Sequence, residues 1–70
     1  MDTVLMPMVG KIVKIDVKDG DTVESGQQLG IFESMKMEMP LVATSDGVVK
    51  NIQVAVGQVV EADAPLCDIV

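Results

Sequence analysis

The sequence predicts an all-β domain: a flattened eight-stranded β-barrel or sandwich of two four-stranded sheets related by a pseudo-two-fold axis. Three observations lead to this prediction. Apolar and polar residues alternate over short stretches, glycine-containing turns separate these stretches, and residues 4–33 are repeated by residues 41–70. Each half is too small to bury its own apolar face, so the halves gain most by packing face to face. We therefore expect residues 1–70 to form a single domain, with residues 34–40 connecting the halves.

The internal repeat is most visible where identical residues stand 37 positions apart. Glycines, aliphatic residues and one glutamate coincide, and the two halves align without a gap. Equivalent positions should therefore form equivalent strands and turns. The pairs are Gly10 with Gly47, Ile15 with Ile52, Val17 with Val54, Gly20 with Gly57, Val23 with Val60, Glu24 with Glu61 and Leu29 with Leu66.

Alternation of apolar and polar residues identifies the longer strands. In residues 11–18, lysine and aspartate alternate with Val13, Ile15 and Val17, which is the period of a strand with one buried face. Residues 49–54 occupy the equivalent position and alternate in the same way. We expect eight strands, at residues 3–7, 10–17, 22–24, 28–33, 37–43, 48–54, 59–61 and 66–69.

Short turn signals separate these strands. Glycine tolerates positive φ, and an aspartate beside it can bond to nearby backbone. No helical period of useful length interrupts this arrangement. In chain order the signals are Asp19-Gly20, Ser25-Gly26, Asp46-Gly47 and Gly57.

The connector at residues 34–40 departs from the usual turn chemistry. A two-residue hairpin turn would place Met35 and Lys36 at its centre, where positive φ normally selects glycine or asparagine. Positive φ at two residues with long side chains costs on the order of 1 kcal/mol or more for each residue. Backbone strain of this kind is concentrated at functional sites. Lys36 has no counterpart in the repeat, and the fold should place it at the end opposite the chain termini. These features predict a functional lysine, exposed on a hairpin turn.

Composition excludes several classes of function. The net charge of −6 and the pI near 4.1 disfavour nucleic acid and anionic membrane surfaces as partners. No apolar run approaches the ~20 residues of a membrane-spanning helix, and the amino end lacks the pattern of a signal peptide, so we expect a cytoplasmic protein without membrane insertion. The absence of histidine and the single cysteine, Cys67, argue against a metal site or a disulfide. Cys67 is expected to be a core residue.

The segment from Glu33 to Glu38, with the order Glu-Ser-Met-Lys-Met-Glu, resembles the biotin-attachment motif of biotinyl domains, the biotin carboxyl carrier modules of biotin-dependent carboxylases and decarboxylases. The resemblance covers essentially the whole chain and includes the segments 6–10, 17–21 and 42–49. Ser34 stands where alanine is commonest in the motif, and Val9 stands where many members have proline. The fold of this family is the symmetric barrel-sandwich hybrid expected above.

The resemblance implies that Lys36 takes biotin covalently from a biotin protein ligase. The domain would then carry carboxyl groups between a biotin carboxylase and a carboxyltransferase or decarboxylase, without being an enzyme and without catalytic residues of its own. Residues flanking the lysine would serve recognition by these partners. They are Glu33, Ser34, Met35, Met37 and Glu38.

Other interpretations of these residues stay open at the level of sequence. Met35 and Met37 could instead fill the end of the core, and Glu33 with Glu38 could be imagined as an acid/base pair. A lipoyl carrier of the same fold, or a protein that accepts both biotin and lipoate, is the main alternative, although the order Met-Lys-Met favours biotin. A structural adaptor without modification would carry long helical segments between the halves, and none is present.

Overall fold

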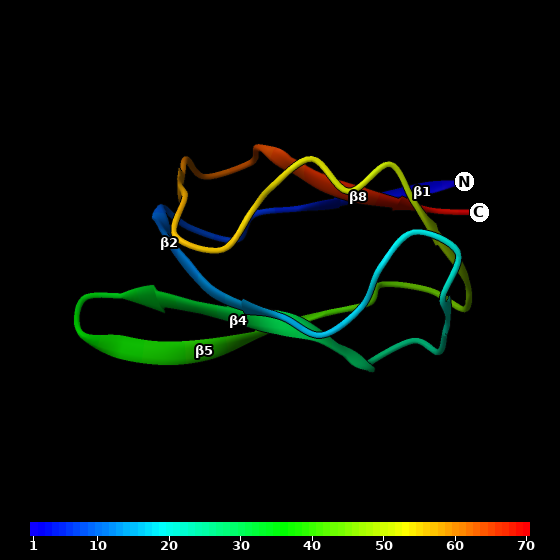
Figure 1. Cartoon of the computed structure of the whole chain (residues 1–70), viewed down its shortest axis with the longest axis horizontal. Helices are drawn as coiled ribbons and strands as arrows, with labels where there is room; N and C mark the ends of the chain where they lie inside the picture. Colours follow the sequence, from blue (N-terminus) through cyan, green and yellow to red (C-terminus); the bar gives the residue numbers. More distant parts are fainter.

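The computed structural model describes residues 1–70 as two four-stranded antiparallel sheets that pack face to face, with no helix (Figure 1). The molecule measures 31 × 17 × 16 Å along its principal axes. One sheet has the strand order β1-β8-β6-β3 and the other β5-β4-β2-β7. The predicted fold class is confirmed, and all eight expected strands are present. They are β1 (Asp2–Leu5), β2 (Gly10–Ile15), β3 (Thr22–Val23), β4 (Gln28–Ser34), β5 (Met37–Val42), β6 (Gly47–Lys50), β7 (Val59–Val60) and β8 (Pro65–Ile69).

The predicted pseudo-two-fold relation is visible in the backbone hydrogen bonds. Met6 N donates to Ala64 O at 2.9 Å, and 37 positions away Ala43 N donates to Gln27 O at 2.9 Å. Exchanging β1 with β5, β2 with β6, β3 with β7 and β4 with β8 converts one sheet order into the other. The two halves of the sequence therefore form equivalent units, and the axis that relates them exchanges the two ends of the molecule.

The core lies between the sheets and consists mainly of aliphatic residues. Phe32, the single aromatic residue, is 1% exposed and stands between Met39 and Ile12 in the register of the β5-β4-β2 ladder. Met6 and Ile12 are fully buried, and Cys67 is a buried free thiol, as expected from the sequence. The full cluster contains Val4, Met6, Ile12, Val23, Leu29, Phe32, Leu41, Ala43, Val49, Val60, Leu66, Cys67 and Ile69.

Three strands end two or more residues earlier than expected: β1 ends at Leu5 and not at residue 7, β2 at Ile15 and not at residue 17, and β6 at Lys50 and not at residue 54. The strand expected at residues 48–54 ends at Lys50, because Asn51 has a φ of 57° and turns the chain out of the sheet. Ile52 and Val54 are still half-buried and pack against the core, so the alternation identified the buried face but not the pairing. The strand expected at 10–17 ends at Ile15, the last residue of its ladder with β4.

The chain ends and the β4–β5 turn lie at opposite ends of the molecule, as predicted. β1 and β8 pair antiparallel with Asp2 opposite Ile69, which brings the amino and carboxyl ends together. Figure 1 shows both termini at one end and the green turn between β4 and β5 extending from the other. We call these the terminal end and the hairpin end.

Candidate functional site

The hairpin of β4 and β5 ends in a two-residue turn. The two strands stay in register from Ile31 opposite Pro40 up to Ser34 opposite Met37, which leaves only Met35 and Lys36 between them. Their φ values are 53° and 63°, so both central residues are in the left-handed region, as a type I′ turn requires. The predicted backbone of the turn is confirmed.

Lys36 carries its amine free of protein partners. The residue is exposed, and its amine forms neither a hydrogen bond nor a salt bridge. The one salt bridge of the molecule joins Lys14 Nζ and Asp16 Oδ1 at 3.0 Å, on another part of the surface. The pKa of the Asp16 carboxyl is lowered by its hydrogen bond from Gln28 and by Lys14. Lys36 is therefore open to an enzyme that approaches the turn from solvent.

Met35 and Met37 flank the lysine on the surface of the turn. They are 88% and 64% exposed, so neither fills the end of the core. Met39, two residues further along β5, is half-buried and packs against the core cluster. The exposed thioethers give the tip an apolar character that a water-facing turn does not need for folding.

Glu33 and Glu38 lie directly opposite each other in the β4–β5 register. Lys11 of β2 stands opposite Glu33 on its other side, yet it forms no salt bridge with it. Like charges in facing positions are unfavourable, and neither glutamate lines a cavity that could serve as a catalytic cleft. The pair therefore forms an exposed acidic edge beside the tip.

Ser34 differs from the other residues predicted to serve recognition because its side chain is buried, with 9% exposure. It pairs with Met37 and closes the base of the turn. Next to it, a side chain at Gly10 would lie 2.7 Å from the Glu33 carbonyl oxygen, so β2 approaches β4 too closely for any other residue. The structure thus brings the six motif residues together, with five exposed and Ser34 beneath them.

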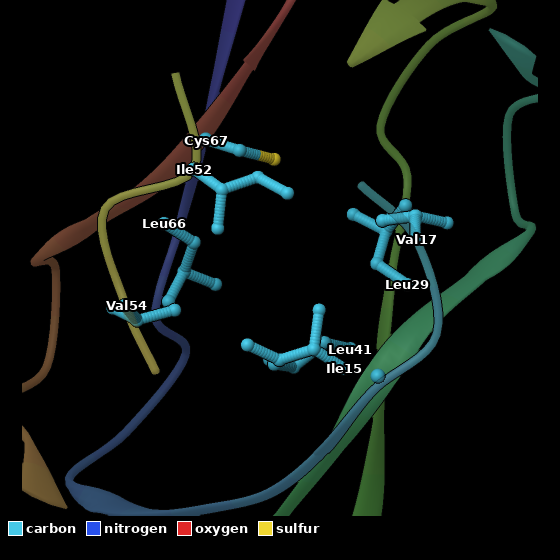
Figure 2. Close-up of a pocket in the computed structure, with 9 residues that line it drawn as sticks. Ile15, Val17, Leu29, Leu41, Ile52, Val54, Leu66 and Cys67 are labelled. Carbon is cyan, nitrogen blue, oxygen red and sulfur yellow. The ribbon is translucent and has the colours of Figure 1, made fainter. Parts of the chain in front are cut away.

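An apolar cavity of about 30 Å³ lies between the sheets, away from the hairpin (Figure 2). Ile15, Val17, Leu29 and the thiol of Cys67 face it. Burial raises the pKa of the Cys67 thiol, with smaller contributions from Asp68 and Asp19. The cavity has room for about one water molecule and lacks polar partners for it, so it is a packing defect and not a ligand site.

The structure contains no group of three or more metal-ligating side chains placed to hold an ion. It also contains no helix that is long and apolar enough to span a membrane.

Comparisons with known proteins identify the family of the chain. A family model described as "Biotin-requiring enzyme" matches residues 2–69. The biotin/lipoyl attachment protein of Bacillus subtilis (strain 168) is 49% identical over 51 residues, which cover 73% of this chain and 70% of the relative. The biotin carboxyl carrier protein of acetyl-CoA carboxylase from Solanum lycopersicum is 46% identical over 59 residues, 84% of each chain.

Solved structures share the whole fold. The Kluyveromyces lactis urea carboxylase superposes on 99% of the chain with a TM-score of 0.91 and 35% sequence identity. A single-chain, multi-domain long-chain acyl-CoA carboxylase covers 94% with a TM-score of 0.87 and 30% identity. The chain spans 6% and 7% of these two large enzymes. The chain belongs to the biotin/lipoyl attachment family, whose members include biotin carboxyl carrier domains.

Proposed function

We propose that Lys36 carries covalently attached biotin and that the domain is the carboxyl carrier of a biotin-dependent carboxylase or decarboxylase. The observation that carries this proposal is the turn: an unpaired, exposed amine on two strained residues, at the end farthest from the chain termini. A free primary amine is the group that forms an amide with the carboxyl group of biotin. Family membership supports the choice of cofactor.

Attachment joins Nζ of Lys36 to the carboxyl carbon of an activated biotin, while the amine loses a proton and the activating group departs. No thiol or carboxylate contacts Lys36, and Cys67 is buried far from the turn, so the domain has no group that would catalyse this step. A biotin protein ligase therefore supplies the activated acyl group. Met35, Met37, Glu33 and Glu38 are the exposed side chains that such a ligase meets first.

Once attached, biotin supplies a ring nitrogen that accepts and releases a carboxyl group. The domain holds the attachment point on a rigid hairpin, so the position of the arm depends on a few rotatable bonds of Lys36. Tethering then gives the arm a high effective concentration at both a biotin carboxylase site and a carboxyltransferase or decarboxylase site. The domain contributes position, and its partners contribute the chemistry.

Lipoate on the same lysine is the second candidate. It is favoured by one specific observation, the 49% identity to a protein named for both biotin and lipoyl attachment. The fold and the exposed amine serve either acid equally. The sequence Met-Lys-Met around the amine is the feature that places biotin first.

The test is the intact mass of the protein after co-expression with a biotin protein ligase, or with a lipoate ligase in a parallel culture. We expect a single biotin-sized increase in the wild type and in Lys50→Arg, which changes an exposed lysine on β6. Lys36→Arg should remain unmodified. A lipoyl-sized increase without biotin would assign the domain to lipoate, and modification of Lys36→Arg would place the site elsewhere.

A further inference from the structure

The pseudo-two-fold axis supplies an internal control for the surface around the hairpin. The loops before β2 and β7 lie at the hairpin end, and their counterparts before β6 and β3 lie at the terminal end. Their backbones match: Gly57 N donates to Ile12 O at 2.7 Å, as Gly20 N donates to Val49 O at 2.7 Å. The two glycines have φ values of 91° and 97°. Differences between side chains at equivalent positions therefore do not come from the backbone.

Four such positions are aliphatic at the hairpin end and polar at the terminal end. The aliphatic residues are exposed to water by 39% to 67%, although folding has no use for apolar side chains there. The pairs are Met8 with Ser45, Val9 with Asp46, Val56 with Asp19 and Val59 with Thr22.

Two of the polar counterparts tie loops together. Asp46 Oδ1 accepts a hydrogen bond from Ser25 N at 2.7 Å, and Asp19 Oδ1 accepts one from Ile52 N at 3.1 Å. The valines at the equivalent positions of the hairpin end have no acceptor and make no such bond. The hairpin end thus lacks two side-chain-to-backbone hydrogen bonds between loops and exposes apolar surface at the same positions. Stability does not explain that exchange.

Three of the aliphatic side chains belong to the β5-β4-β2-β7 sheet or directly precede its strand β2, on the way to the level of the attachment turn. Lys11 pairs with Glu33 on one side and with Val59 on the other, so Val59 shares a row of the sheet with the acidic edge. β2 runs antiparallel to β4, so Val9 and Met8, which precede it, continue toward the level of the turn. Figure 1 shows the blue start of β2 and the orange segment before β8 at the same end as the hairpin. We call Met8, Val9 and Val59 the apolar shoulder.

We propose that the apolar shoulder is a docking surface for the ligase that acylates Lys36, an inference that rests on the proposed function. The unmodified lysine side chain is short, so the enzyme that acylates it must contact the surface at the base of the hairpin. A carboxylase binds the longer, biotinylated side chain, so its own surface need not contact the domain as closely. Charge indicates the chemistry of the partner surface: an apolar area flanked by cationic side chains that face Glu33 and Glu38.

The experiment measures the steady-state rate of biotin attachment by a biotin protein ligase at varied concentrations of the domain. Val59→Thr removes apolar surface without a change of shape or charge. Its matched control is Val42→Thr, which makes the same change at an exposed valine of the same sheet but toward the terminal end of β5. A triple variant adds Met8→Ser and Val9→Asn, which are polar residues of the kind found at the equivalent positions.

We expect the KM for the domain to rise about threefold in Val59→Thr and about tenfold in the triple variant, with little change in kcat. Val42→Thr should match the wild type. Equal KM values in all variants, or the same increase in Val42→Thr, would overturn the docking surface while leaving biotin attachment intact. A wild type that takes no biotin from the ligase would instead reject the proposed function. Thermal unfolding midpoints verify that each variant is folded, and Val59→Thr alone decides the question if the triple variant is not.

Discussion

Lys36 differs from the four other lysines in its backbone and not in its side chain. It is the one lysine with positive φ, and its neighbour Met35 shares that conformation. The left-handed region costs a residue with a Cβ roughly 1–2 kcal/mol, so the turn stores strain in the two residues that present the amine. The paired strands impose this strain, because their register leaves only these two residues to connect them, and so fix the lysine at a defined apex.

At the same scale, replacing each of the two exposed methionines, Met35 and Met37, with glycine should change the free energy of unfolding in opposite directions. Met35→Gly relieves the left-handed strain and should raise the free energy of unfolding by about 0.5–1 kcal/mol. Met37→Gly places glycine in β5 and should lower it by about 1 kcal/mol. Urea denaturation followed by circular dichroism measures both. A loss of stability in Met35→Gly would mean that its thioether contributes packing that outweighs the strain.

At the scale of elements, the two halves differ where β2 and β6 end. A side chain at Gly30 would collide with the carbonyl oxygen of Lys14 on β2. The equivalent position in the other half holds Cys67, whose side chain fits because the chain leaves the sheet at Asn51, the counterpart of Lys14. The backbone conformation at Asn51 therefore breaks the repeat. The residue that faces it accordingly differs between the halves: glycine at position 30 and cysteine at position 67.

This asymmetry predicts unequal effects of alanine at equivalent positions. Gly30→Ala forces a methyl group against a backbone oxygen of a paired strand and should cost about 2–3 kcal/mol. Cys67→Ala removes one buried sulfur and should cost about 1 kcal/mol. Thermal and urea denaturation of the two variants provide the comparison. Equal losses would show that β2 can move away from β4 without penalty.

Register explains why the strand ends were mispredicted while the strands themselves were not. Alternation reports which side chains face the core, and Ile52 and Val54 do face it. Strand pairing depends on where the neighbouring strand lies. Ile52 N does not donate to a neighbouring strand but to Asp19 Oδ1 of the other half, at 3.1 Å. No local pattern in residues 48–54 records that partner, which is 33 positions away.

At the scale of the whole molecule, the buried Cys67 thiol lies beside the apolar cavity between the two sheets. Burial raises its pKa above that of an exposed thiol, so the folded state favours the neutral form. The unfolded chain releases this proton above a pH of about 8.5, whereas the folded chain retains it. Stability from this group is present below that pH and is lost as the pH rises toward the folded pKa.

We therefore expect the free energy of unfolding to fall as the pH rises above about 8.5, with Cys67→Ala showing a smaller decrease over the same range. Urea titrations at several pH values between about 7 and 10 measure the slope for both proteins. Reaction of the native thiol with a disulfide reagent provides an independent check and should be slow until the protein unfolds. Identical slopes in both proteins would remove Cys67 as the source.

Much of the site could be predicted from the residues alone. The turn at Met35 and Lys36, its positive φ values and the exposure of the lysine follow from the repeat and from the two-residue connector between strands. The burial of Ser34 did not follow, because it depends on the side of the sheet that the turn leaves facing the core. The apolar shoulder was also missed, since Met8 and Val59 are far apart in sequence and are brought to the same end of the sheet only by the β2 pairings.

The sequence by itself determined the all-β class, the duplication and the place of Lys36 between the halves, because alternation, turn residues and repeats are local properties of the chain. Only the tertiary structure decided which strands pair, where β6 ends and which exposed side chains surround the lysine. Those features depend on contacts between the halves, and such contacts are set by the packing of two sheets across a common core and not by neighbours in sequence.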